Sequence, residues 1–333
     1  MGLREDIDRV AADADFSGVV RVERGGAIEL DLAYGLADRA HGIPCAVDTR
    51  FAIASGAKGF TALTVMALVE DGLLRLDMPA RQLLGDDLPL IDDAVTIEQL
   101  LAHRSGIGDY LDEDAHPDPN DYVMPVAVQR LASSADYLAI LDGFPMSHPP
   151  GEVFAYCNGG FVVLAVLAER ASGTPFHELV AERVCRPAGL TRTAFLRTDE
   201  LPGDVAVGYV TMDGVVRSNI FHLPVRGSGD GGIFTTVDDV TRLWDAVEAG
   251  LIVAPHLAAE MTRVRSVDGD RAYGLGFWLH PTRDVVSLEG FDAGVSFRAV
   301  HDREHHVRHT VIGNTTEGAW PVSRLLGDTL GTR

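Results

Sequence analysis

Strand-like segments lie at both ends of this 333-residue chain, whereas helical segments occupy most of its middle. Near the N-terminus, the apolar or alternating runs 17–24 and 28–35 flank Gly25 and Gly26, a pattern that predicts a β-hairpin. Four more strands are expected in the ranges 272–279, 284–288, 294–301 and 306–314. A single sheet that uses all of these strands must bring the two ends of the chain together. The pattern therefore predicts an α/β domain built from both termini, with a helical domain inserted between them.

The expected domain boundaries follow the same change in pattern. Residues 1–75 and 225–333 are assigned to the α/β domain, and residues 76–224 to a mainly helical insertion. Two domains also agree with a typical domain size of about 150 residues. Helical periodicity or capping residues predict helices at the N-terminus (Leu3, Ile7, Val10) and at 55–75, 96–103, 126–142, 160–172, 175–184, 236–249 and 319–330.

The charge balance restricts the partners. The formal net charge is −21, and both nucleic acids and anionic membranes select for basic protein faces. No stretch reaches about 18 uninterrupted apolar residues, and the charged N-terminus lacks the apolar core of a secretory signal. We therefore expect a cytoplasmic protein that acts on a small molecule, with no nucleic-acid or membrane partner. The oligomeric state is not predicted.

The cysteines and histidines give no clear metal or disulfide pattern. Cys45, Cys157 and Cys185 form neither a disulfide framework nor a CxxC pair. Four histidines crowd an expected hairpin tip, where we favour a solvated turn over a metal site: His301, His305, His306 and His309. The sequence therefore predicts no metal and no cofactor.

Lys58 is the only lysine, beside 27 arginines. A lysine can lose its proton when it is desolvated, whereas arginine stays protonated in proteins. Lys58 lies three residues after Ser55, so the two side chains share one face of the helix expected at 55–75. A serine becomes a good nucleophile when a nearby base takes its proton. Ser55 and Lys58 are therefore a candidate nucleophile and base. The alternative interpretation of the same two residues is a helix cap followed by an exposed charge.

A second candidate element is Tyr156-Cys157-Asn158, which precedes the helix expected at 160–172. A phenol beside an ammonium can ionise at reduced cost and relay protons. The amide of Asn158 can orient Lys58 and hold a substrate carbonyl. A buried tyrosine bonded to a carbonyl is the plain structural alternative.

Together these elements resemble the superfamily of serine β-lactamases, penicillin-binding proteins and esterases, above all its class C branch, which has Tyr in the second motif. The resemblance extends over nearly the whole chain and includes the stretches 68–86, 96–107, 156–176, 227–244 and 273–278. It implies a β-lactamase/transpeptidase-like fold, with an antiparallel sheet flanked by helices and an inserted helical domain. It also implies that Ser55 forms an acyl-enzyme while Lys58 and Tyr156 move the proton.

The third motif of that family departs from its usual pattern here. By resemblance, Leu288-Glu289-Gly290-Phe291 occupies the place of Lys or His, a small residue, Gly and the second oxyanion donor. The expected oxyanion hole is then the N–H groups of Ser55 and Phe291. With Asn158, the residues Leu288, Gly290 and Phe291 complete the expected substrate-binding set. Leu288 removes a cation that holds a substrate carboxylate, so efficient β-lactam hydrolysis is not expected. Because strand side chains alternate, Leu288 and Glu289 cannot both face the site, and a solvated edge charge is favoured for Glu289.

Three readings of the function follow from these residues. The first is a serine hydrolase that acts on an ester or amide, as a carboxylesterase or peptidase-like enzyme with weak β-lactamase activity at most. The second is a transacylase or amide-forming enzyme that uses the same acyl-Ser55. The third is a binding protein that keeps the fold but has lost catalysis. The acidic loop 108–126 is expected to be either a lid or a plain surface excursion, and His103 to serve a structural role at a helix end.

Overall fold

The computed structural model describes residues 2–113, 116–269 and 271–333. Its main element is an antiparallel sheet of eight strands in the order β2-β1-β14-β13-β12-β11-β10-β9. The chain order of these strands is β1 (Gly18–Arg24), β2 (Ala27–Tyr34), β9 (Ser266–Asp268), β10 (Arg271–Tyr273), β11 (Trp278–Leu279), β12 (Val285–Asp292), β13 (Val295–Asp302) and β14 (Val307–Gly313). The N-terminal hairpin pairs with β14, so both ends of the chain build one sheet.

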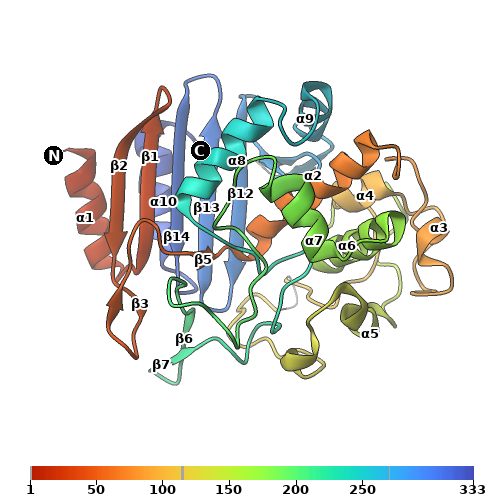
Figure 1. Cartoon of the computed structure of the whole chain (residues 1–333), viewed down its shortest axis with the longest axis horizontal. Helices are drawn as coiled ribbons and strands as arrows, with labels where there is room; N and C mark the ends of the chain where they lie inside the picture. The colour runs from red at the N-terminus through yellow and green to blue at the C-terminus, as the bar shows by residue number, and fades with distance from the viewer. Residues whose placement is uncertain (1, 114–115, 270) are drawn as a thin grey trace.

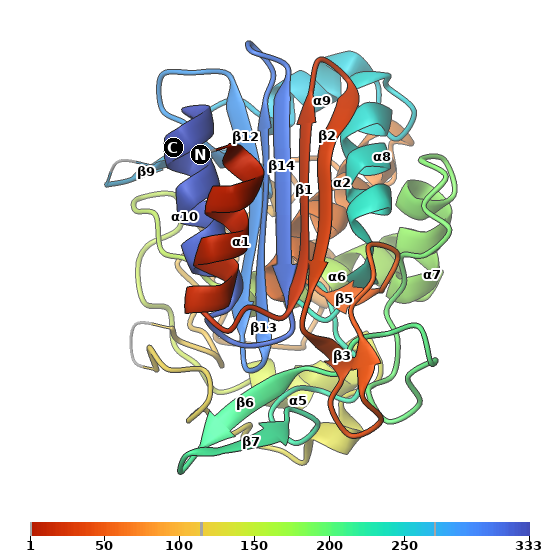
Figure 2. The same cartoon turned by 90° about the vertical axis from the view of Figure 1, so that its left-hand side faces the viewer.

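Helices cover both faces of this sheet (Figures 1 and 2). The helices are α1 (Leu3–Asp13), α2 (Ala57–Glu70), α3 (Arg81–Leu84), α4 (Ile97–Leu101), α5 (Leu138–Leu141), α6 (Asn158–Ser172), α7 (Phe176–Val180), α8 (Val237–Glu248), α9 (Pro255–Met261) and α10 (Ala319–Leu330). Figure 2 shows α1 and α10 on one face and α8 with α2 on the other. The first pair buries Ile7, Val322 and Leu326 against Val20 and Val311 of the sheet.

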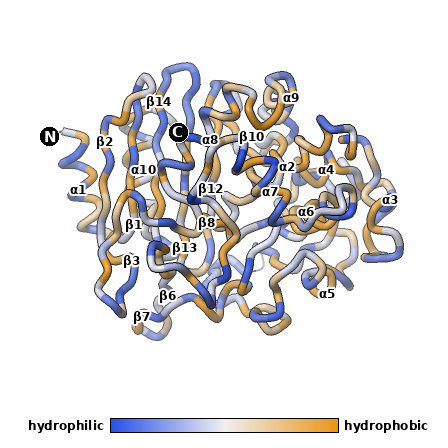
Figure 3. The backbone as a smooth tube through the Cα atoms, in the orientation of Figure 1, coloured by the Kyte–Doolittle hydropathy of each residue, from blue (hydrophilic) through white to orange (hydrophobic). Residues whose placement is uncertain are grey.

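The predicted β-lactamase/transpeptidase-like architecture of an antiparallel sheet with flanking helices is confirmed. Helices α3 to α6 gather beyond one end of the sheet (Figure 1). Between them and the sheet lies α2, in which every residue from Ala57 to Leu68 is buried. Figure 3 shows mostly hydrophobic tube along α2 and α6. Such all-round apolarity is expected of helices enclosed by other elements.

The boundaries 1–75, 76–224 and 225–333 remain a prediction. Residues 205–210 lie beside the sheet rather than among the helices, because Arg50 bridges to Val205 and the N–H of Tyr209 donates to the carbonyl of Asn314. This stretch also adds the hairpin β6 (Tyr209–Met212) and β7 (Val215–Ser218), which was not predicted. Two short pairs complete the strands: β3 (Leu36–Asp38) with β4 (Ile43–Pro44), and β5 (Phe51–Ala52) with β8 (Phe234–Thr235).

Two sequence predictions about elements are wrong. The expected helix 126–142 is a series of short turns ending in α5, because the carbonyls of Val128 and Leu131 accept hydrogen bonds from residues 225 and 226 instead of continuing a helix. The expected strand 272–279 is split into β10 and β11. Gly276, with φ +84°, interrupts it and brings the backbone against Ala62 of α2.

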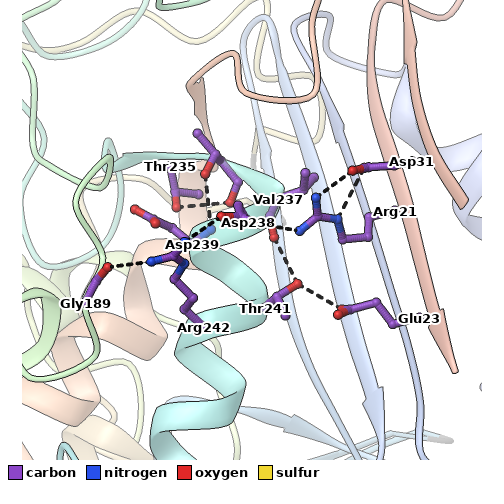
Figure 4. Close-up of polar contacts among 11 residues, drawn as sticks. Arg21, Glu23, Asp31, Gly189, Thr235, Val237, Asp238, Asp239, Thr241 and Arg242 are labelled. Carbon is purple, nitrogen blue, oxygen red and sulfur yellow. Dashed lines mark hydrogen bonds and ion pairs between the residues drawn. The ribbon is translucent and has the colours of Figure 1, made fainter. Parts of the chain in front are cut away.

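A polar network joins α8 to the hairpin β1–β2 and to the segment 189–193 (Figure 4). The buried guanidinium of Arg21 pairs with Asp31 on β2 and with Asp238 in the first turn of α8. Thr236 caps α8, and Asp239 accepts hydrogen bonds from Thr193 and from the backbone N–H of Arg192. The network holds α8 on the sheet, away from the candidate site. Among the described residues, no helix combines the length and apolarity needed to cross a membrane.

Candidate active site

Ser55 lies in a short 3₁₀ turn, η1 (Ala54–Gly56), immediately before α2. The residue before it, Ala54, has φ +44°, a left-handed conformation that a residue with a Cβ adopts at a cost of about 1–2 kcal/mol. The strained turn and the start of α2 place Ser55 at the end of a buried helix, where backbone N–H groups are unpaired and the potential is positive. Both features suit a nucleophile that develops negative charge.

Lys58 contacts Ser55 directly. Its Nζ lies 2.8 Å from Ser55 Oγ, 2.7 Å from Asn158 Oδ1 and 3.0 Å from the carbonyl oxygen of Asp230. The lysine is 2% exposed. Burial lowers the pKa of Lys58 below its ordinary value, although the carboxylates of Asp230 and Glu113 act against that shift. The structure thus brings together the amine and the hydroxyl that the sequence paired.

Tyr156 also contacts Ser55, through a hydrogen bond between their side chains. The Lys58 Nζ sits 4.9 Å from the centre of its ring, and the ring stacks parallel to Trp278. Burial raises the pKa of Tyr156 well above its ordinary value, and the nearby charge of Glu113 raises it further. The expectation that the phenol ionises at reduced cost is therefore wrong for this resting site. Tyr156 is a neutral phenol that can donate a proton.

Asn158 is the first residue of α6 and links Lys58 to the acidic loop 108–126. Its Nδ2 donates to Glu113 Oε1 at 2.9 Å, while its backbone N–H donates to the buried carboxylate of Asp109. The N–H of Gly159 donates to the same carboxylate. Asp109 therefore satisfies two unpaired donors at the start of α6. Burial nevertheless raises its pKa to about 6.

His103 has the structural role that was expected. Its Nδ1 accepts a hydrogen bond from the N–H of Cys157 at 3.1 Å, and its carbonyl accepts one from the N–H of Ala155. The ring also lies against Tyr156, with 4.2 Å between the ring centres. Burial keeps the pKa of His103 well below its ordinary value, so it is a neutral acceptor. His103 thereby holds the backbone on both sides of Tyr156.

The glycine-rich turn 227–232 supplies a site residue that the sequence analysis missed. The carbonyl of Asp230 accepts from Lys58, and its carboxylate accepts from the Tyr110 hydroxyl at 2.5 Å. The turn approaches α6 so closely that a Cβ on Gly229 would lie 2.0 Å from the carbonyl oxygen of Phe161. A charged residue inside an otherwise glycine-rich turn was the available signal.

Strand β12 passes directly beside the turn that carries Ser55. A Cβ on Gly290 would lie 1.9 Å from the carbonyl oxygen of Ile53 and 3.1 Å from the N of Gly56. Only glycine allows this approach, and it places the backbone of Phe291 next to Ser55. Gly290 and Phe291 thus lie at the site as predicted, while the role of their N–H groups remains a proposal.

Leu288 is not where the sequence analysis put it. Its side chain is 2% exposed and packs in the core against Gly59 of α2, so it cannot contact a substrate. Glu289 points to the opposite face of β12, toward the site. It is no solvated edge charge, because it forms ion pairs with Arg271 at 2.7 Å and with Arg298 at 3.1 Å. The alternation of β12 was read correctly, but the wrong residue was assigned to the pocket.

Two cavities meet at Ser55. The first, which we name the acidic cavity, encloses about 750 Å³ including its open mouth. The second, the tryptophan groove, runs along β12 toward β10 and β11. Ser55, Glu113 and Phe291 border both. The side chains that matter below are Asn158, Tyr110, Tyr122, Asp230 and Asp292 in the acidic cavity, and Tyr156, Arg271, Trp278 and Glu289 in the tryptophan groove.

Among the described residues of the range 108–126, Tyr110, Tyr122 and Met124 line the acidic cavity, so this part of the loop is a cavity wall rather than a plain surface excursion. The thiol of Cys157 is buried beneath this wall, as expected of a core cysteine, and accepts a hydrogen bond from the N–H of Gly160. The closing motion of a lid stays a prediction.

Two of the four histidines of the C-terminal hairpin, His305 and His306, lie exposed in its turn as expected, but the other two do not. His301 and His309 are buried, and burial lowers the pKa of each to about 3. His301 contacts Glu248, and His309 contacts the hydroxyl of Thr332. Within the described ranges, no group of three or more His, Cys, Asp or Glu side chains is arranged to hold a metal ion.

Comparison with known families agrees with this geometry. The model of the beta-lactamase family matches residues 3–323, almost the whole chain. The chain belongs to the beta-lactamase family. This confirms the resemblance that Ser55-x-x-Lys58 and Tyr156-x-Asn158 indicated.

The proteins that this chain resembles differ from one another in the activity that their names give. Esterase EstB of Burkholderia gladioli is 32% identical over 282 residues, covering 74% of this chain and 69% of the esterase. The D-aminopeptidase of Brucella anthropi is 29% identical, over 80% of this chain and 49% of that protein. The structure of a penicillin-binding protein from Bacillus halodurans superimposes with a TM-score of 0.91 at 32% identity, covering 97% of this chain and 99% of that one. Among these curated relatives, the chain spans between half and about two thirds of the partner's length.

Proposed function

We propose that this protein hydrolyses a small ester or amide through an acyl-enzyme on Ser55. The observation that carries the proposal is the contact of 2.8 Å between Ser55 Oγ and the buried Nζ of Lys58. Esterase and aminopeptidase relatives support ester or amide substrates. The tyrosine at the second motif supports a class C-like arrangement.

The mechanism assigns each proton. The neutral amine of Lys58 takes the proton of Ser55, and Oγ forms a bond to the substrate carbonyl carbon. The oxyanion so formed accepts hydrogen bonds from the N–H groups of Ser55 and Phe291, each worth about 2.7–4 kcal/mol in the transition state. When the bond to the leaving group breaks, Tyr156 donates a proton to that group and is reprotonated by Lys58. Water then attacks the acyl-enzyme by the same route in reverse, which releases the acid and restores Ser55.

Efficient β-lactam hydrolysis is not part of this proposal. The family cation is missing at Leu288, and the nearest arginine of the tryptophan groove, Arg271, is already paired with Glu289. A charge-assisted hydrogen bond to a substrate carboxylate is worth about 1.5–3 kcal/mol, so its loss weakens carboxylate-bearing substrates.

Labelling with a fluorophosphonate probe tests the nucleophile. Wild-type protein should gain one adduct by intact mass, and Ser55→Ala should gain none. Thermal melting of both proteins shows that the variant is folded. Labelling that persists in Ser55→Ala would disprove the assignment of Ser55.

The second candidate is acyl transfer to an amine or alcohol, since two cavities open onto Ser55 and could hold two partners. Product analysis with added acceptors separates the two functions. Free acid as the dominant product supports hydrolysis, whereas a dominant amide or ester product supports the transferase. A decayed binding protein is disfavoured, because the contacts of Lys58 with Ser55 and Asn158 are intact.

A further inference from the structure

A further cavity, which we name the distal chamber, adjoins the acidic cavity. It encloses about 760 Å³ including its open mouth. Five residues border both cavities: Ala52, Thr198, Leu223, Phe234 and Val295. Ala52 precedes Ser55 by three residues, and both border the acidic cavity. The common wall therefore runs from the neighbourhood of the nucleophile to the chamber.

The walls of the distal chamber are tied to the large sheet. Ala52 of β5 and Phe234 of β8 are paired neighbours in the common wall. Asn314, directly after β14, donates through Nδ2 to the carbonyl of Val207 at 2.9 Å. Asn219, directly after β7, donates through Nδ2 to the carbonyl of Ala293 at 2.8 Å. Because these hydrogen bonds join the outer wall to the sheet, the fold itself fixes the shape of the chamber.

The lining of the chamber suits an uncharged hydrocarbon group. Among the described residues that border it, Asp199 is the only ionisable one, and its carboxylate is paired with Arg197 at 2.8 Å. Most of the other side chains are apolar, among them Phe51, Leu201, Ala206, Val207, Ile220 and Phe234. The acidic cavity differs, because the carboxyls of Glu113, Asp230 and Asp292 line it. An apolar group gains free energy when it leaves water for such a chamber, whereas a charged group loses it.

The position of Tyr156 decides which part of the substrate reaches the chamber. Tyr156 borders the tryptophan groove, and Asn158 borders the acidic cavity. In the proposed mechanism Tyr156 gives its proton to the leaving group, so the leaving group occupies the groove. The acyl group that stays on Ser55 then occupies the acidic cavity. No described residue borders both the groove and the distal chamber, so the chamber is reached from the acyl side.

We propose that the distal chamber binds the far end of an uncharged, medium-length aliphatic acyl group. The chain would leave Ser55 along the common wall of Ala52, Phe234 and Val295 and end beside Ile220 and Leu223. This rests on the proposed acyl-enzyme at Ser55 and narrows its substrates to esters and amides of medium-chain aliphatic acids. The chamber takes no part in the covalent step, which remains the attack of Ser55 on the carbonyl.

The test varies the length of the acyl chain. The readout is the ratio of kcat/KM for p-nitrophenyl octanoate to kcat/KM for p-nitrophenyl acetate, at concentrations below micelle formation. Each methylene buried in the chamber is worth about a fourfold gain, so the wild-type ratio should be about tenfold or more. Ser218→Trp places an indole at an exposed position of β7 that borders the chamber, and should lower the ratio about tenfold.

Two comparisons make this test specific. Val215→Trp is the matched control, because Val215 is exposed on the same strand but faces the opposite way and does not border the chamber. It should leave the ratio unchanged. Octyl acetate and ethyl acetate carry the chain in the leaving group instead, and their relative turnover should be the same in the wild type and in Ser218→Trp.

Each outcome has one meaning. A wild-type ratio near or below one, with turnover that depends on Ser55, overturns the chamber proposal and leaves the proposed function intact. A high ratio that Ser218→Trp does not lower also overturns it, as does a selective loss of octyl acetate turnover in that variant. Turnover of p-nitrophenyl acetate that survives in Ser55→Ala overturns the proposed function itself. If Ser218→Trp does not fold, Ile220→Trp replaces it at a second exposed position of the chamber, with the same expected result.

Discussion

The acidic cavity and the tryptophan groove share Ser55 but differ in how the charges of their carboxylates are offset. In the groove, Glu289 is only 16% exposed at its side chain and is neutralised by Arg271 and Arg298. No arginine is among the described residues that line the acidic cavity. Burial raises the pKa of both Asp230 and Asp292, the charge of Asp230 adds to the rise at Asp292, and the charge of Lys58 acts against both shifts. Pairing with an opposite charge offsets the cost of burying Glu289, whereas carboxyls with raised pKa values that line a cavity are candidates for contact with a ligand.

The largest expected effect comes from Lys58, which contacts the Ser55 hydroxyl shared by the two cavities. Lys58→Arg should lose kcat for p-nitrophenyl acetate by about a thousandfold or more, and as severely as Lys58→Ala, because arginine cannot give up its proton. Steady-state kinetics of the two variants provide the measurement. Substantial activity in the arginine variant would show that a permanent charge suffices and that Lys58 is not the base.

The second largest loss of kcat is expected from a substitution of Gly290, where β12 passes beside Ser55. In Gly290→Ala the new Cβ would meet the carbonyl of Ile53, so β12 must move away from Ser55 and take the N–H of Phe291 with it. The loss of one oxyanion donor lowers kcat by about 100-fold or more. Because a shifted strand also affects stability, kcat is compared at a temperature where circular dichroism shows the variant folded. A kcat near that of the wild type would exclude Phe291 from the oxyanion hole.

Removing the negative charge of Glu289 from the groove should increase activity moderately toward a substrate that carries a carboxylate. Glu289→Gln frees Arg271 and Arg298 to bind a substrate carboxylate, so kcat/KM for the β-lactam nitrocefin should rise about tenfold. Leu288→His makes the sharper comparison: it introduces the family cation at a core position against Gly59, and should destabilise the protein without a similar gain. A gain with Leu288→His but none with Glu289→Gln would reverse our assignment of these two side chains.

The smallest expected effect is on the stability of the protein and comes from Asp292, which lines the acidic cavity. The folded-state pKa of Asp292, about 7, lies above its unfolded value, so its stabilising contribution is complete below the unfolded pKa and is lost as the pH rises through 7. Asp292→Asn removes this loss and should raise Tm at pH 8 by about 2 °C. The gain should vanish near pH 4, which scanning calorimetry at the two pH values can measure. Equal shifts at both values would show that Asp292 ionises freely in the folded protein.

Residues close together in the sequence made parts of the site predictable. Ser55 and Lys58 lie one helical turn apart, so their contact follows from local geometry once the helix forms. Family membership and the sheet built from both ends of the chain were also predicted correctly. Asp109, Glu113 and Asp230 were not identified, because each becomes a site residue only through contacts with residues more than 40 positions away.

The sequence by itself indicated the proposed nucleophile Ser55 and the proposed base Lys58 through residue type and short spacing, and the family resemblance pointed to Gly290, which lets β12 approach them. Only the tertiary structure decided which face of β12 meets the substrate. A strand turns alternate side chains to opposite sides, and which side is core depends on what packs there: here Gly59 of α2 accepts Leu288, and Glu289 is left beside Arg271 and Arg298. Nor could the sequence reveal that the carboxylates of Glu113, Asp230 and Asp292 border one cavity, since these distant residues converge only in the folded chain.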